Sequence, residues 1–239
     1  MTKIGFEFEF VTTMTATETR SKLKKLGLKF SKKTDWSLVC DMSIESRRSK
    51  SMFVYGHELV SPPMAPAKAL KMMDLVFEFM RANNIETNTT TGLHVNMDIG
   101  KRATKRIEPT KLVTLVDDEA VAKRYNRSKA YYCLPHKSKI RKQVKYWDNL
   151  KNKPCNLKDY IKDWGLTPEE LDEKYSAINF NHQQDAGYLE FRMIGNRGYE
   201  NRYKEIAKDI QHFETCMIKA ADKDAGNKAV SRRLNKMAA

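Results

Sequence analysis

The heptapeptide IGFEFEF at residues 4–10 is the stretch from which the fold can be predicted. Ile4 and three phenylalanines alternate with Gly5, Glu7 and Glu9, which is the two-residue period of a strand with one buried face. The phenylalanines are expected to face a core, and the two carboxylates to stand side by side on the opposite face. Such like charges repel, so water or a divalent cation must compensate them. A solvated strand would explain one such pair, but the pattern returns later in the chain.

Three further segments combine an apolar face with a polar one. They are predicted strands at residues 53–60, 92–100 and 187–194, with the sequences FVYGHELV, GLHVNMDIG and GYLEFRMI. The polar side chains expected opposite the apolar faces are Glu58, His94, Asn96, Glu190 and Arg192. A lone histidine or one Glu/Arg pair is typical of an ordinary surface. Four such strands in one small chain favour a common site.

The remaining periodicity predicts an α+β fold with a mostly antiparallel sheet flanked by helices. Shorter strands are expected at 36–41 and 176–181, and helices at 15–28, 66–83, 109–125, 137–150, 156–164, 167–174 and 199–221. We expect one catalytic domain over residues 1–239, with a basic helical insert at 124–175. The basic residues 224–239 are expected to form a frayed tail.

Composition limits the partners and the compartment. The net charge of +14, from 44 Lys and Arg against 30 Asp and Glu, favours polyanions such as nucleic acid, nucleotide phosphates or acidic substrates. Four scattered cysteines without a C-x-x-C pair argue against disulfides and structural zinc, and fit a reducing cytoplasm. Neither a signal peptide nor an apolar run of membrane-spanning length is recognisable, so no membrane partner is expected.

The polar faces together indicate phosphate chemistry. Glutamate clusters with few nitrogen ligands suit Mg²⁺ or Mn²⁺, and an arginine beside such a glutamate suits a phosphate. The sequence thus predicts a nucleotide polyphosphate held by metals on the open face of the sheet. It contains no G-x-x-x-x-G-K-[ST] loop and no recognisable Cys or Ser nucleophile motif, which argues against a P-loop NTPase and against covalent catalysis.

Six motifs follow one another along the chain: GFEFEF (5–10), Asp41-x-Ser43, HELVSPP (57–63), TGLHVN (91–96), KYSAINFN (174–181) and LEFRMIGN (189–196). This succession resembles the amidoligase family, over about residues 3–197. The resemblance implies a curved half-barrel sheet like that of glutamine synthetase and glutamate–cysteine ligase. It also implies that ATP phosphorylates a carboxylate, and that an amine then displaces phosphate to form an amide or isopeptide-like bond.

The resemblance also implies roles for individual residues. Glu7, Glu9, Glu58 and Glu190 match metal-binding positions, and His94 and Asn96 match positions near the nucleotide. Arg192 matches the arginine that stabilises the transferring phosphoryl group. Arg124 or Arg127, in KRYNRS, resembles the segment that contacts the carboxylate substrate or phosphates, and the choice between them is open. Asp41 and Ser43 are expected to shape the substrate pocket, with Asp41 a candidate to remove a proton from the amine.

Two other classes of function fit part of the sequence. The glutamates and the basic surface could serve a two-metal phosphodiesterase or nuclease. The basic, aromatic stretch 124–153 could instead serve a non-catalytic nucleic-acid-binding protein. Neither substrate of a ligase is identified by the sequence, and either one could be a peptide or a macromolecule.

Overall fold

A six-stranded antiparallel sheet forms the centre of the molecule. The computed structural model describes residues 1–32, 34–45, 54–130, 133–151, 160–162 and 175–238. The strand order is β2-β3-β1-β4-β6-β5, so β2 and β5 are the edges and the described sheet is open. The α+β class is confirmed, whereas the half-barrel stays a prediction. The strands are β1 (Lys3–Thr12), β2 (Ser37–Cys40), β3 (Tyr55–Val60), β4 (Gly92–Asp98), β5 (Ile178–Asn179) and β6 (Leu189–Gly195).

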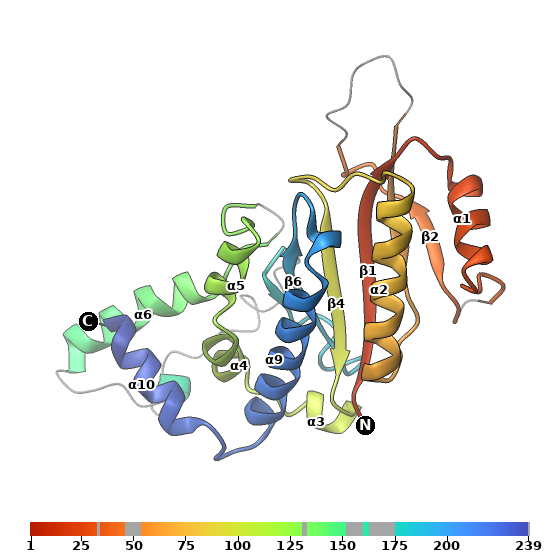
Figure 1. Cartoon of the computed structure of the whole chain (residues 1–239). Coiled ribbons are helices and arrows are strands. Elements are labelled where there is room, and N and C mark those ends of the chain that lie inside the picture. The colour runs from red at the N-terminus through yellow and green to blue at the C-terminus, as the bar shows by residue number, and fades with distance from the viewer. Residues whose placement is uncertain (33, 46–53, 131–132, 152–159, 163–174, 239) are drawn as a thin grey trace.

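Two helices cover the apolar face of the sheet. Figure 1 shows α2 (Pro66–Ala82) and α9 (Tyr203–Ala221) running along the strands in front of β1, β4 and β6. The ring of Phe8 meets Phe77 of α2 edge-on, with centroids 6.0 Å apart. Phe191 of β6 stacks on Phe213 of α9 at 4.4 Å. The predicted apolar stripes therefore form the core, and the opposite face of the sheet is left for polar side chains.

The helix ends follow local signals, with one exception. Helix α1 (Ala16–Lys25) begins at Thr15, whose side chain forms a capping box with Glu18. The expected helix at 109–125 is divided into α4 (Pro109–Val116) and α5 (Asp118–Arg124), because Asp117 adopts a left-handed conformation with φ of 59°. The Asp117 side chain then accepts a hydrogen bond from the Ala120 amide and so caps α5.

A second group of helices lies beside the sheet. Helix α6 (Lys137–Lys151) packs against α4, α5 and α10 (Asn227–Ala238), as the left of Figure 1 shows. The expected frayed tail at 224–239 differs from the structure, because Val230 and Leu234 of α10 are fully buried. Three apolar positions at helical spacing, the third being Met237, are sufficient to dock a basic helix.

Some expectations concern residues that the structure does not describe. The predicted helix at 167–174 lies outside the described residues, as does most of the predicted helix at 156–164. Several predicted strands are shorter than expected, among them those at 36–41 and 176–181, which become Ser37–Cys40 and Ile178–Asn179. Strand β4 ends at Asp98, where Gly100 with φ of 101° turns the chain into α3 (Lys101–Thr104).

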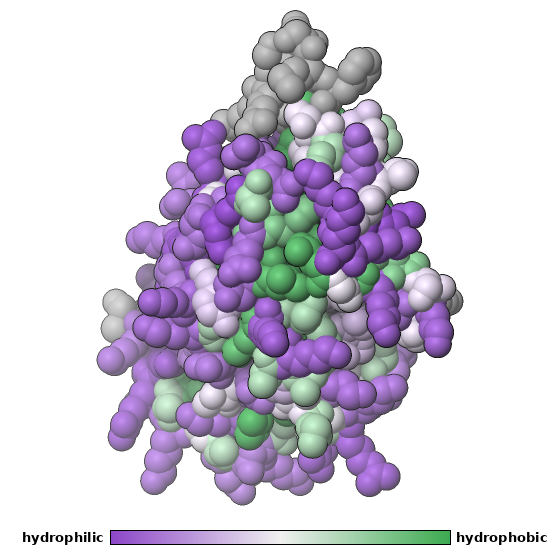
Figure 2. Space-filling view, turned by 45° about the vertical axis from the view of Figure 1, so that its right-hand side comes forward, coloured by the Kyte–Doolittle hydropathy of each residue, from purple (hydrophilic) through white to green (hydrophobic). Residues whose placement is uncertain are grey.

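The surface is predominantly polar. Figure 2 shows hydrophilic side chains over most of one face, with an apolar area near its centre. Among the described residues, no helix combines the length and the apolar composition needed to cross a bilayer.

Candidate active site

The polar face of the sheet carries the predicted site residues in register. Glu9 lies opposite Glu58 on β3, and Glu7 lies opposite His94 on β4. Side chains paired in this way share one face, because neighbouring strands are pleated in phase. They line a cavity of about 550 Å³, which lies within the range of small-molecule sites. Its lining includes the predicted Glu7, Glu9, Asp41, Ser43, Glu58, His94, Arg127, Glu190 and Arg192.

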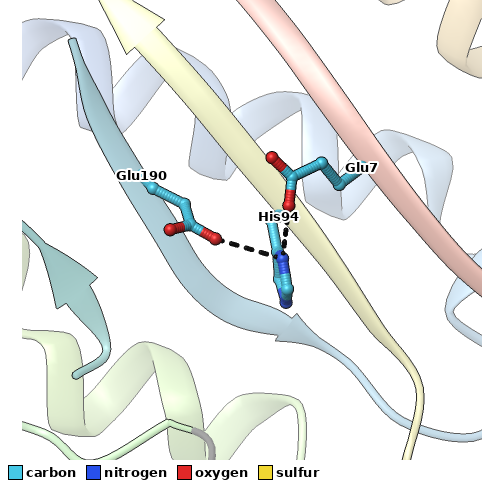
Figure 3. Close-up of side chains that lie close together, drawn as sticks. All are labelled: Glu7, His94 and Glu190. Carbon is cyan, nitrogen blue, oxygen red and sulfur yellow. Dashed lines mark hydrogen bonds and ion pairs between the residues drawn. The ribbon is translucent and has the colours of Figure 1, made fainter. Parts of the chain in front are cut away.

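The first cluster is centred on His94, which stands between Glu7 and Glu190 (Figure 3). The His94 Nδ1 atom lies 2.9 Å from Glu7 Oε2 and 3.1 Å from Glu190 Oε1. A bulge between Leu93 and Val95 interrupts the β4–β6 register at this histidine. The cluster therefore joins three strands, although its glutamates are far apart in the sequence.

Neighbouring groups determine the charges of this cluster. Burial acts to lower the pKa of His94, but the facing carboxylates of Glu9, Glu190 and Glu7 outweigh it and raise the pKa to about 9. Burial acts to raise the pKa of Glu190, yet His94 and Arg192 together bring it to about 2. In Glu7 the same competition between burial and His94 lowers the pKa. The glutamates are thus held as carboxylates.

Three neighbouring side chains donate hydrogen bonds that orient the carboxylates of Glu7 and Glu190. Asn96 donates a hydrogen bond to Glu7 Oε1 at 2.6 Å, and Asn179 of β5 donates one to Glu190 Oε2 at 2.8 Å. Arg192 donates to Glu190 Oε1 at 2.5 Å. Asn96, which the resemblance places near the nucleotide, thus holds the carboxylate of Glu7 and is not among the residues that line the cavity. Asn179 was not predicted, although it lies in the quoted motif at 174–181.

A second cluster lies on the same face and consists of Glu9, Asp41 and Glu58. One carboxylate oxygen from each of the three lies within 4.8 Å of the others. Burial, with the nearby charges of Glu7, Glu9 and Asp41, raises the pKa of Glu58 to about 7. Asp41 also accepts hydrogen bonds from the Ser43 amide and hydroxyl, at 2.8 and 2.7 Å. The structure therefore brings Asp41 to the carboxylates, a placement that the pattern around 41–43 did not predict.

The composition of the two clusters fits divalent cations. The second cluster offers only carboxylate oxygens, the ligands that Mg²⁺ and Mn²⁺ prefer, and the first offers two carboxylates and one imidazole. The buried His94 Nε2 has no hydrogen bond within the described part of the chain, although Glu9 Oε1 lies 3.4 Å away. The carboxylates of the second cluster repel one another, as the raised pKa of Glu58 indicates, and a divalent cation would relieve this repulsion.

Arg127 lines the cavity next to Gly92, the first residue of β4. Its buried guanidinium donates to the Thr91 carbonyl at 2.6 Å. Gly92 and Gly195 pair across β4 and β6. A Cβ on Gly195 would collide with this guanidinium, and a Cβ on Gly92 would lie 2.9 Å from His94 Nε2 and 3.1 Å from the guanidinium. The adjacent Gly92 amide donates to Glu9 Oε2 at 2.5 Å. Two glycines thus make room for an arginine cation beside the second cluster.

Arg124 lies elsewhere. Its guanidinium pairs with Asp209 on α9, and it is not among the residues that line the cavity. Tyr125 also donates to Asp209, at 2.7 Å. Of the two arginines between which the sequence left the choice open, the structure brings Arg127 to the site and gives Arg124 a contact with α9.

One end of the cavity has lining residues that were not predicted. His182 and Tyr188 stack with ring centroids 4.7 Å apart, and Tyr175 and Asn181 line the same cavity. Burial and the charges of Glu7 and Glu190 raise the pKa of Tyr188 to about 12. The turn before β6 gave no chemical signal in the sequence, because its aromatic residues are not in a recognisable motif.

The chain matches a known protein family over most of its length. A family model described as "Putative amidoligase enzyme" matches residues 1–196. This range includes all six strands and every residue of the two clusters, and it ends before α9 and α10. No curated protein matches the chain.

Proposed function

The chain belongs to the amidoligase family, and from this premise we propose that it is an ATP-dependent ligase that joins a carboxylate to an amine. The observation that carries the proposal is the pair of clusters on one cavity wall, with Arg127 and Arg192 beside them. Carboxylates and guanidinium groups together are what a bound polyphosphate requires, since the chemistry consists of positioning and charge neutralisation.

The proposed reaction has two steps. In the first, a substrate carboxylate oxygen attacks the γ-phosphorus of ATP, the bond to the β-phosphate oxygen breaks, and ADP leaves. In the second, the amine nitrogen attacks the acyl carbon, the carbon–oxygen bond to the phosphoryl group breaks, and inorganic phosphate leaves. The nitrogen loses one proton as the amide forms. One ATP is consumed for each amide bond.

The residues of this chain have distinct parts in that scheme. Glu7, His94 and Glu190, and separately Glu9, Asp41 and Glu58, would hold divalent cations. When bound, Mg²⁺ or Mn²⁺ would neutralise the phosphate charge and align the transferring group.

Arg127 and Arg192 would supply positive charge at the site whether or not a metal cation is bound. Arg192 donates to Glu190 and lines the cavity, so its guanidinium is placed to stabilise the equatorial oxygens of the transferring phosphoryl group. Arg127, held by the Thr91 carbonyl, is suited to the carboxylate substrate or to a phosphate. The location of Asp41 within a cluster favours a role in cation binding over removal of the amine proton.

An isotope experiment tests the proposal directly. The purified chain is incubated with ATP, Mg²⁺, a panel of carboxylates labelled with ¹⁸O and a panel of amines, and ADP and phosphate are quantified. Release that requires both an acid and an amine, with one ¹⁸O recovered in phosphate, is the expected result. Amide formation with no ¹⁸O recovered in inorganic phosphate would refute the acyl-phosphate step.

Matched variants locate the activity. Glu7→Gln and Glu190→Gln are expected to lower the rate by about 100-fold or more, because each removes a carboxylate that would hold a cation against the phosphates. Glu78→Gln makes the same chemical change at an exposed position of α2, on the other side of the sheet, and is expected to leave the rate unchanged. Full activity in both site variants would disprove the assignment.

The same preparations discriminate the other classes of function. Metal-dependent cleavage of DNA or RNA without ATP would identify a phosphodiesterase. Salt-sensitive nucleic-acid binding without nucleotide binding would identify a non-catalytic binding protein. The family match supports the ligase over both.

A further inference from the structure

A second cavity lies between α6 and α10, apart from the cavity on the sheet. It has a volume of about 510 Å³. Figure 1 shows the two helices side by side at the left of the molecule, and α10 lies beyond the residues that the family model matches. Its lining comprises five basic side chains, one carboxylate and one methionine: Lys137, Arg141, Lys145, Arg233, Lys236, Asp117 and Met237. We call this cavity the basic groove.

Local contacts hold three of the five cations in place. Lys137 pairs with Asp117 at 2.5 Å, and Arg141 pairs with Glu119. Arg233 donates to the carbonyls of Thr114 and Leu115 at 2.7 and 2.8 Å, where α4 ends. Since carbonyls carry no full charge, the positive charge of Arg233 is not neutralised by these bonds.

The other two basic side chains of the groove carry positive charges that no acidic side chain in the described part of the chain neutralises. Lys145 and Lys236 are exposed, and neither has an ion-pair partner in the described part of the chain. Two surface ammonium groups facing one groove, together with Arg233, create a local excess of positive charge. Such a groove attracts an anionic partner and loses affinity as salt is added.

The spacing of the cations suits an extended polypeptide. Lys137, Arg141 and Lys145 are four residues apart on α6, which corresponds to about 6 Å along a helix. In an extended peptide, alternate side chains lie about 6.6 Å apart on one side. Glutamates at every second position would therefore meet successive cations of the α6 stripe.

The described lining of the groove is basic and lacks aromatic side chains. Proteins that bind single strands combine cations with aromatic platforms on which bases stack. Among the lining side chains that the structure describes, none is aromatic, and Met237 is the apolar one. We propose that the basic groove binds an acidic polypeptide segment with carboxylates at alternate positions.

The groove begins close to the cavity on the sheet. His136 directly precedes Lys137, and its ring meets Phe180 edge-on with centroids 6.0 Å apart. Asn179 and Asn181, on either side of Phe180, line the cavity of the candidate active site. The segment that lines the candidate active site thus contacts the residue that directly precedes the first α6 residue of the groove.

Fluorescence anisotropy with the full chain and no ATP tests the groove separately from the ligase. The probe is a labelled twelve-residue peptide in which glutamate alternates with serine, and the reference is the same peptide with glutamine. We expect the glutamate peptide alone to bind, with a Kd that rises steeply with salt. Lys145→Glu/Lys236→Glu is expected to weaken binding by about tenfold or more, because two attractions become repulsions.

A matched control and a competing ligand make the result decisive. Lys68→Glu/Lys71→Glu reverses two exposed charges on α2 and is expected to change the Kd less than twofold. Circular dichroism establishes that each variant is folded. Equal effects of the two double variants would overturn the proposal, because long-range charge would then explain the binding. Tighter, Lys145/Lys236-dependent binding of a single-stranded oligonucleotide would reassign the groove to nucleic acid. None of these outcomes depends on ligase activity.

Discussion

Gly195→Ala is expected to destabilise the fold and to displace the arginine of the candidate site. Gly195 has φ of 145°, a conformation that costs other residues about 1–3 kcal/mol. An added Cβ would collide with the Arg127 guanidinium and lie 2.7 Å from both Gly92 Cα and the Thr91 carbonyl oxygen. Overpacking of this kind costs about 1–3 kcal/mol more. Equilibrium urea unfolding should therefore show a loss of about 2–6 kcal/mol, the sum of these two terms.

Two further variants separate the contributions. Gly27 also has positive φ, at 88°, but a Cβ there would meet nothing within 4 Å. Gly27→Ala should therefore lose only the backbone term, about 1–2 kcal/mol. In an Arg127→Ala background, Gly195→Ala should cost less by about 1 kcal/mol, since one collision is removed. A Gly195→Ala protein within about 0.5 kcal/mol of the parent would refute the reasoning.

The remaining predictions concern the active site, a buried acid and the C-terminal helix. Arg192→Lys should lower ligase turnover at least about tenfold in a steady-state assay, because an ammonium group lacks the guanidinium fork. Burial raises the pKa of Asp118 from 3.8 to about 7. Between these two pH values the folded state therefore keeps a proton on Asp118 that the unfolded state has lost. Stability should then fall as pH rises from about 4 to 7, by up to about 1.4 kcal/mol per unit, and Asp118→Asn should remove this slope in urea titrations at several pH values. Leu234→Ala should cost about 2–4 kcal/mol by thermal or urea unfolding, whereas a frayed tail would give no change.

The periodic part of the fold was predictable from sequence. Alternation at residues 4–10 places the phenylalanines in the core and the glutamates opposite, because side-chain direction in a strand depends only on the local backbone. Helix starts at Thr15 and Pro109 followed from capping chemistry. The break at Asp117 did not, since a left-handed non-glycine residue is stabilised by its own cap and by the packing of α5.

The site was predictable as a set of residues but not as an arrangement. Sequence showed that Glu7, His94 and Glu190 occupy polar faces, whereas only strand order shows that they meet at one imidazole. The two clusters, and the inclusion of Asp41 in one of them, depend on contacts between distant segments. The choice between Arg124 and Arg127 required the position of Asp209 on α9. The docking of α10 likewise depended on burial against distant helices.

The position of β1 in the middle of the sheet has a consequence for biosynthesis. This strand is made first among the six, yet both of its neighbours, β3 and β4, are encoded later. Its row of phenylalanines therefore leaves the ribosome before any partner strand exists. At about 5–20 residues per second the delay until residue 60 is translated is several seconds, and longer until residue 98. An exposed, strongly apolar strand with free edges is prone to intermolecular pairing during that time. Glu7 and Glu9, which pair with His94 in the finished site, would by their charge oppose the stacking of identical nascent chains before β4 is made.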